Sequence, residues 1–345
     1  MENLITSDKQ LYYRLIALWA VCEGVLGGLI HGIQIPITGL TVGSAAVIII
    51  SLIGYYVPSK GAIIKATILV CIFKMMLSPH SPVQAYFAVF FQGVTGQLFF
   101  SNKRFFKTSC LLFASLALFE SGVQKIITLT IFFGKDFWIA INEFITGLTG
   151  QKEITNYSFY IAGGYVLLHL ITGIVIGYTA GRIPERLLIW NKDVQRISLT
   201  KPSLPDPVST TGRRKKWKNS LFVIWIILFG LYLQSALNIG KPILSSNETL
   251  HILIRSALIL FSWYFILNPI LIYFLKKWLS KQKSIWQTTI NEILLLIPST
   301  RLLLEKSWIS TSGDSGLKRM KIFFKIVLLN SLIPSSENIN LDSDA

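Results

Sequence analysis

Cysteine, histidine and acidic residues are scarce in this chain. Its 345 residues include 3 Cys, 4 His and 17 Asp and Glu, with no C-x-x-C pair. An odd number of cysteines provides no disulfide framework. All three cysteines fall inside apolar segments, where we expect them to act as small buried side chains. No close pair of acidic residues favours phosphoryl or prenyl transfer.

The motifs of several common enzyme classes are also absent. The sequence has no G-x-x-x-x-G-K loop, so we expect this chain not to hydrolyse ATP itself. H-E-x-x-H, G-x-S-x-G and G-x-G-x-x-G are missing too. The histidines have no metal-ligand spacing. We therefore predict a protein that is not an enzyme and that needs no cofactor or metal.

Apolar residues dominate what is present. They make up 52% of the chain, and the mean hydropathy is +0.56, which excludes an ordinary soluble protein. Segments of about 20 apolar residues are long enough to cross a bilayer. We predict an all-α polytopic membrane protein with eight spans, near residues 11–31, 40–57, 62–77, 83–101, 108–133, 159–181, 220–239 and 251–275.

The positive charges sort to one side of this arrangement. With the N-terminus inside, 27 of the 33 Lys and Arg residues fall in or next to inner loops. Because cytoplasmic loops are enriched in these residues, the pattern predicts that both termini are cytoplasmic. We expect a bacterial plasma membrane. The net charge of +16 then indicates contact with anionic lipid head groups rather than with nucleic acid.

The chain divides into two unequal parts. Residues 1–195 hold six spans, which predicts a six-helix bundle. Residues 196–219 have the Pro, Ser and Thr content of a linker, followed by a basic run. Residues 220–345 add two spans and a cytoplasmic tail. The tail pattern predicts two amphipathic helices, over 285–307 with a bend at Pro298 and over 317–332.

Two spans carry small residues at intervals of four. Residues four apart share one face of a helix, and small side chains let two helices approach closely. Such stripes serve either internal packing or docking of another membrane subunit, and both readings stay open here. The stripes are Ala20, Gly24, Gly28 and Gly32 in the first span, and Gly173, Gly177 and Gly181 in the sixth.

Ionisable groups also lie inside the spans. A charge near the bilayer centre costs roughly 2.5–3.5 kcal/mol, so such groups face a bundle interior or a water-filled cavity. Internal pairing of Glu23, Lys74 and the others is one explanation, and a pocket loaded from outside is the other. The predicted pocket residues are Thr38, Thr41, Gln92, Thr95, Glu120, Lys125 and His169.

Three short motifs carry a family resemblance: PITGLTVG at residues 36–43, PSKGA at 58–62, and GVTG at 93–96. Their order resembles the substrate-binding S components of energy-coupling-factor vitamin transporters, nearest the biotin type. The resemblance implies a six-helix bundle. It also implies that Ala20, Gly24 and Gly28 meet a membrane coupling subunit.

The second part of the chain looks like a reduced T component of the same transporters. In that family, membrane helices lead into two cytoplasmic coupling helices that rest on separate ATPase subunits. Here the two tail helices would take that place, and Arg301 would lie at the subunit interface. Two spans are fewer than a T component has, and its Ala-Arg-Gly-type motif is not evident.

We therefore expect a transporter component that binds a small, vitamin-like solute from outside. Partner subunits, including ATPases, would drive its uptake. Lysine would suit a carboxylate of the solute, and glutamate an amine. Two alternatives remain at this stage: a membrane enzyme acting on a lipid or isoprenoid, and a scaffold that docks a cytoplasmic partner.

Overall fold

The structure is a computed structural model that describes residues 8–26, 38–57, 59–78, 81–149, 156–193, 226–227, 229–230, 232–234, 237 and 246–333. These residues are almost all helical and include no strand. The elements are α1 (Asp8–Val21), η2 (Cys22–Leu26), α3 (Thr38–Tyr56), α4 (Ala62–Leu77), α5 (Val83–Phe99), η3 (Lys103–Phe105), α6 (Phe106–Thr149), α7 (Tyr157–Ala180), α8 (Ile183–Asp193), α10 (Ser246–Ser262), η4 (Trp263–Leu267), α11 (Asn268–Ile285), α12 (Gln287–Ser310) and α13 (Gly316–Leu332).

Four helical stretches are long and apolar enough to cross a membrane: Gly39–Tyr56, Phe106–Thr149, Tyr157–Ala180 and Thr249–Ile285. The all-α membrane class is thus confirmed. The predicted segments 62–77 and 83–101 are helices α4 and α5, of 16 and 17 residues. Most of the predicted span 220–239 and all of the predicted linker 196–219 lie outside the described residues.

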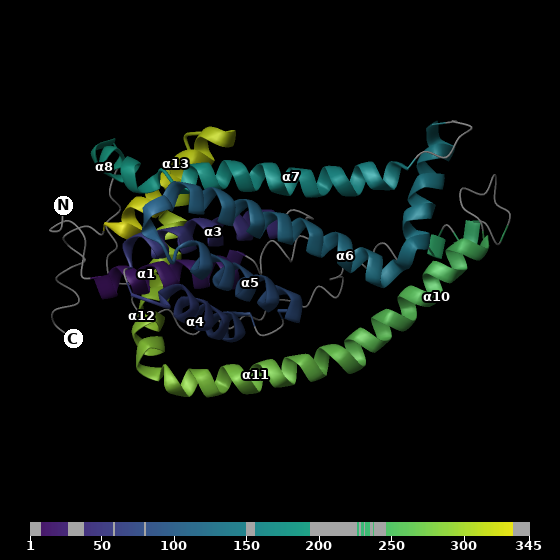
Figure 1. Ribbon diagram of the computed structural model, residues 1–345, viewed down its shortest axis with the longest axis horizontal. Helices are drawn as coiled ribbons and strands as arrows, with labels where there is room; N and C mark the ends of the chain where they lie inside the picture. Colours follow the sequence, from purple (N-terminus) through teal and green to yellow (C-terminus); the bar gives the residue numbers. More distant parts are fainter. Residues whose placement is uncertain are drawn as a thin grey trace.

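Helix α1 lies at the centre of the main core. Leu15, Ile16 and Trp19 are fully buried, and α1 contacts α3, α4 and α12. Figure 1 shows α1, α3, α4 and α5 side by side, with α6 and α7 above them. Burial on every side explains why α1 shows no polar face.

Helices α6 and α7 pack most closely, through the second glycine stripe. A Cβ atom on Gly173 would come within 2.8 Å of the Ala114 carbonyl oxygen, and one on Gly177 within 2.7 Å of that of Cys110. Only residues without a side chain permit this approach. The stripe of the sixth predicted span therefore serves internal packing. The opposite face of α7 exposes large apolar side chains such as Leu168, Ile171 and Val175.

Helix α6 bends at Gly134, whose φ of 78° and ψ of −172° suit glycine alone. The segment after the bend rises to meet the start of α7 in Figure 1. This segment continues α6 to Thr149, beyond the fifth predicted span, which ends near residue 133. Phe132 and Phe133 at the bend form a second, smaller core with Ile252 and Leu253 of α10.

Elements α10, η4 and α11 form one continuous arc in Figure 1. Its 37 apolar-rich residues from Thr249 to Ile285 correspond to about 55 Å of helix. One end packs on the bend of α6, and the other contacts α4 and α5. Between these ends large apolar side chains such as Leu258, Phe265 and Phe274 stay exposed. That surface is what a lipid-facing helix presents.

The tail helices pack on the end of the bundle that holds α1 and α8. Predicted segments 285–307 and 317–332 correspond to α12 and α13, and Pro298 lies inside α12. Ile290, Ile293 and Ile297 of α12 join the same core as α1. The last third of α13 is buried, while Leu317 at its start is 90% exposed. The two parts of the chain therefore share one core.

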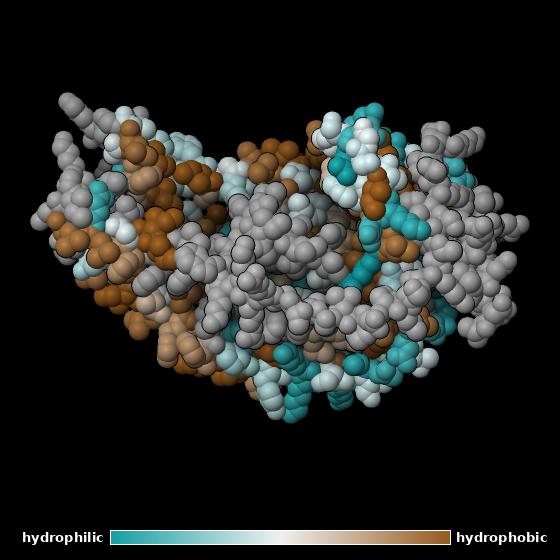
Figure 2. Space-filling view, turned by 180° about the vertical axis from the view of Figure 1, so that it is seen from behind, coloured by the Kyte–Doolittle hydropathy of each residue, from teal (hydrophilic) through white to brown (hydrophobic). Residues whose placement is uncertain are grey.

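The surface reflects this layout. Figure 2, seen from behind, shows apolar surface gathered on the half that holds the bend of α6 and α10. Hydrophilic surface lies toward the half that holds α12 and α13. The ends of α3, α6 and α7 near α8 thus lie on the more polar side.

Candidate functional site

A buried ion pair accounts for two of the ionisable groups inside the predicted spans. Lys74 Nζ of α4 lies 2.6 Å from Glu23 Oε2 of η2, and the two side chains are 6% and 5% exposed. Element η2 is a π-helical turn, which locally widens the helix and redirects its side chains. Because each charge neutralises the other, this pair does not need an external ligand.

Gln92 and Thr95 of α5 are both buried, but their partners differ. Thr95 Oγ1 donates to the carbonyl oxygens of Phe91, at 2.6 Å, and Gln92, at 3.2 Å, so its hydroxyl is satisfied within α5. The side-chain amide of Gln92 lies against Gly43 of α3. Its Oε1 atom is buried and has no hydrogen-bond partner among the described residues.

Glu120 and Lys125 lie on α6 but are not brought together. Five residues of α-helix turn the two side chains about 140° apart. The described residues contain no ion pair between them. Glu120 Oε2 is buried and finds no hydrogen-bond partner in the described part of the chain. Lys125 is half-buried, roughly 7.5 Å farther along the helix axis.

His169 of α7 is 1% exposed and lies against Gly122 of α6. Its Nδ1 is 2.9 Å from the Tyr165 carbonyl oxygen, which can only accept a hydrogen bond. Nδ1 therefore carries the proton, and in the neutral ring Nε2 is left as an acceptor. The Tyr165 ring packs on the imidazole with 4.4 Å between centroids.

Three of the predicted pocket residues lie at one level, which we call the polar layer: Gln92, Glu120 and His169. Gly43 lies against Gln92 and Leu118, and Gly122 lies against His169, so the layer spans about one turn of α6. Glu120 lies between Leu118 and Gly122 along the helix axis but points about 160° away from both, to the opposite side of α6. Each member offers a hydrogen-bond acceptor. Lys125 lies beyond the layer, toward the bend of α6.

The two threonines at the start of α3 contribute less to this arrangement. Thr41 is exposed on the first turns of α3. Thr38 begins α3, and its side chain lies outside what the structure describes. At the same end of α3, Gly39 packs directly on the Ser121 hydroxyl of α6. This contact places the polar layer just inside the end of α3.

The predicted subunit-interface residues fall in different environments. Ala20 is fully buried, and Gly24 is buried against Leu77 of α4. Both therefore line an internal helix contact rather than an outward face. Gly28 lies outside the described residues. Arg301 is exposed on α12.

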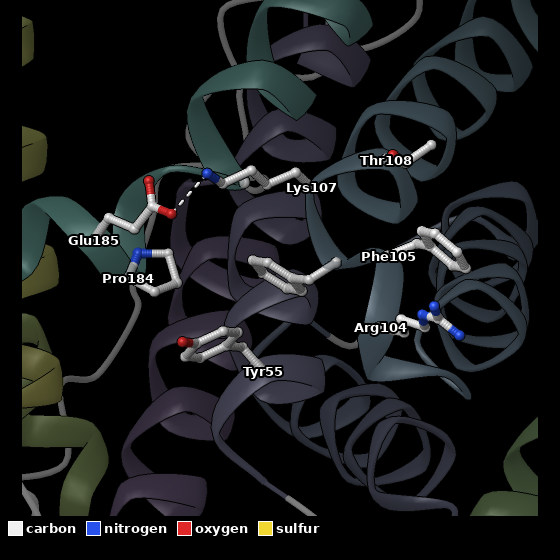
Figure 3. A pocket seen from close by; sticks show the side chains of 9 residues that line it. Tyr55, Arg104, Phe105, Lys107, Thr108, Pro184 and Glu185 are labelled. Carbon is white, nitrogen blue, oxygen red and sulfur yellow. Dashed lines mark ion pairs between the residues drawn. The ribbon is translucent and has the colours of Figure 1, made fainter.

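The structure also reveals a cavity that sequence reasoning missed. Its volume is about 340 Å³, and it lies where α3, α6 and α7 end. Figure 3 shows Lys107 paired with Glu185 on one side and Arg104 on the other. The basic and aromatic residues at 103–107 could have indicated this cavity. Their charges were instead assigned to the orientation of the spans in the membrane. None of the predicted pocket residues lines this cavity.

Comparison with protein families, with curated proteins and with solved structures found no match. The assignment of a function to this helical membrane protein therefore rests on its own residues.

Proposed function

We propose that the chain is the solute-binding membrane component of an uptake transporter. The observation that carries this proposal is the polar layer. Two buried oxygen atoms in it, Gln92 Oε1 and Glu120 Oε2, have no hydrogen-bond partner among the described residues. An unpaired polar group of this kind costs about 1–3 kcal/mol, and more when it is charged. A ligand that donates hydrogen bonds would remove that cost.

The chemistry of the layer restricts the solute. Gln92 Oε1, the Glu120 carboxylate and His169 Nε2 all accept hydrogen bonds. A matching solute therefore presents N–H or O–H groups, such as an amine or an amide. Lys125, roughly 7.5 Å farther along α6, would suit a carboxylate at the other end of the molecule. A small zwitterionic or amide-bearing, vitamin-like compound fits both requirements.

The partners belong to the same proposal. The chain lacks an ATP-binding loop, so energy for uptake would come from separate ATPase subunits, with a membrane coupling subunit between. Arg301 is exposed on α12, as contact with such a subunit requires. The burial of Ala20 and Gly24 moves the expected contact away from the first helix. The exposed faces of α7 and of the α10–α11 arc are the available membrane surfaces.

Native mass spectrometry of the full chain, purified in mild detergent, tests the proposal. We expect a retained small molecule, together with co-purifying subunits. Glu120→Gln should weaken binding of the identified solute roughly tenfold or more, because hydrogen bonds to charged groups contribute about 1.5–3 kcal/mol. Gln92→Leu should act in the same direction.

The matched control is Gln97→Leu. Gln97 is a second amide on α5, and its Oε1 atom is also buried without a hydrogen-bond partner among the described residues. It lies five residues from Gln92 and is turned about 140° from it, so it does not face the polar layer. This change should leave the affinity for the solute unaltered. Equal losses in the Gln92 and Gln97 variants would contradict the proposal. A preparation that retains no solute would favour the scaffold alternative.

A further inference from the structure

The cavity at the ends of α3, α6 and α7 lies at a membrane face. Three of the four stretches that are apolar enough to span a bilayer end here, at Tyr56, Phe106 and Ala180. Tyr55, Thr108 and Gly181 are among its lining residues. The ends of helices that cross a bilayer lie at the level of the lipid head groups, on whichever side of the membrane the cavity faces.

The lining carries two cations and one anion. Lys107 Nζ lies 2.6 Å from Glu185 Oε1, and the side chains are 59% and 61% exposed. An ion pair in water contributes little to stability, so Lys107 can exchange this partner at small cost. Arg104 is exposed, and its backbone N–H donates to Asn102 Oδ1 at 3.0 Å, which fixes the turn that carries it.

Neighbouring basic groups are engaged elsewhere. The Arg182 guanidinium lies 3.8 Å from the centre of the Tyr178 ring and does not line the cavity. Arg104 and Lys107 supply the positive charge of the lining, and in Figure 3 the Arg104 side chain points away from Lys107 and Glu185. The Thr108 hydroxyl adds a hydrogen-bond donor to the lining.

Aromatic side chains form the apolar part of the cavity. The rings of Tyr55 and Phe106 lie 4.8 Å apart, and Tyr55 is 43% exposed. Phe105 is 60% exposed beside Arg104. Aromatic rings are enriched at the boundary between head groups and acyl chains. The cavity thus pairs an anion-binding rim with a surface for the upper part of an acyl chain.

We propose that this cavity binds the phosphate of an anionic phospholipid. Basic pockets between membrane helices are typical sites for such head groups. Thr108 would donate to the phosphate oxygens, and Lys107 would turn from Glu185 toward them. The exposed Arg104 side chain would turn back toward Lys107 to reach the same phosphate. The aromatic surface favours a lipid over a soluble phosphate. The inference is independent of the solute proposed for the polar layer.

Titration of the purified full chain, followed by native mass spectrometry, tests this site. The lipid is phosphatidylglycerol, with zwitterionic phosphatidylcholine as the reference. We expect preferential retention of phosphatidylglycerol. Arg104→Gln should weaken it roughly fivefold, the effect of one basic residue near an anionic head group. Glu185→Gln should strengthen it, because Lys107 loses its competing partner.

Lys60→Gln is the matched control. Lys60 is exposed in the turn between α3 and α4, and it does not line the cavity, so the variant should bind like the unaltered protein. Similar weakening by Arg104→Gln and Lys60→Gln would overturn the site. Weaker binding after Glu185→Gln would also overturn it. Displacement of the lipid by glycerol 1-phosphate at equal concentration would refute the lipid assignment.

Discussion

Removal of one member of the buried pair Glu23 and Lys74 should destabilise the protein strongly. The two atoms lie 2.6 Å apart, and both side chains are nearly inaccessible. At an effective dielectric constant of 20, the direct attraction is about 6 kcal/mol, much of which offsets desolvation. Glu23→Met or Lys74→Met leaves the other charge buried and unpaired. Each single change should therefore cost about 3–5 kcal/mol.

The double variant separates the pair from its surroundings. With both residues replaced by Met, no charge remains buried, and unbranched side chains of similar length fill the space. The double variant should then be nearly as stable as the unaltered protein, or more stable. This outcome is strongly non-additive, as expected for two residues in direct contact.

Thermal unfolding in detergent measures the cycle. Each single change should lower Tm by roughly 4–7 °C, and the double change should restore most of that loss. A useful control is the exposed pair of Lys107 and Glu185, whose removal should scarcely alter Tm. If the double variant loses as much as the sum of the singles, the pairing does not determine the stability of this region.

Further predictions concern the backbone contacts and the tail. Gly177→Ala should destabilise by about 1–3 kcal/mol, since the new methyl group would clash with the α6 backbone. Gly163→Ala, in open space on the same helix, should stabilise slightly. Thermal unfolding distinguishes the two signs. Gly134→Ala should cost about 1–3 kcal/mol, because it forces a side chain into a glycine-only conformation. Gly147→Ala, with nothing within 4 Å, is its control in the same assay. The hydrogen bond from Lys9 to the Glu292 carboxylate of α12 raises the pKa of Lys9 above its usual 10.5. The stability that this hydrogen bond adds is complete below pH 10.5 and is lost as the pH rises through the raised pKa of Lys9. Proteolysis of the tail should therefore become faster across this pH range, and high salt should reduce the difference.

Local patterns predicted the individual helices well. The predicted tail segments correspond to α12 and α13, because an apolar stripe with flanking charges specifies one helix without reference to the rest. The glycine stripe at Gly173 and Gly177 correctly indicated close helix packing. Only the position of α6 in the structure shows that this packing is internal and not a docking surface. The short segment 62–77 is a helix of 16 residues, below the usual length of a span.

Arrangements between distant segments were beyond the sequence. Glu23 and Lys74 are separated by 51 positions, and no spacing rule links them. Because the two side chains pair with each other, neither is available to line a solute pocket. The apolar face of α12 predicted that another element covers it, but the sequence did not indicate that this element is α1. By contrast, the angle between Glu120 and Lys125 follows from their spacing alone, because five residues of one helix turn two side chains about 140° apart.

The arc formed by α10, η4 and α11 is fixed at both ends and free between them. One end is held by the small core at the bend of α6, and the other by the contacts of α11 with α4 and α5. A helix attached in this way acts as a strut of fixed length. If the bend of α6 moves relative to α4 and α5, the strut must bend or release one attachment. The π-helical turn at Trp263–Leu267 lies near its middle and interrupts the α-helical hydrogen-bond pattern there. Bending at that turn would absorb a movement of the α6 bend, whereas an arc that stays straight there would pass the movement on to α12 and the tail.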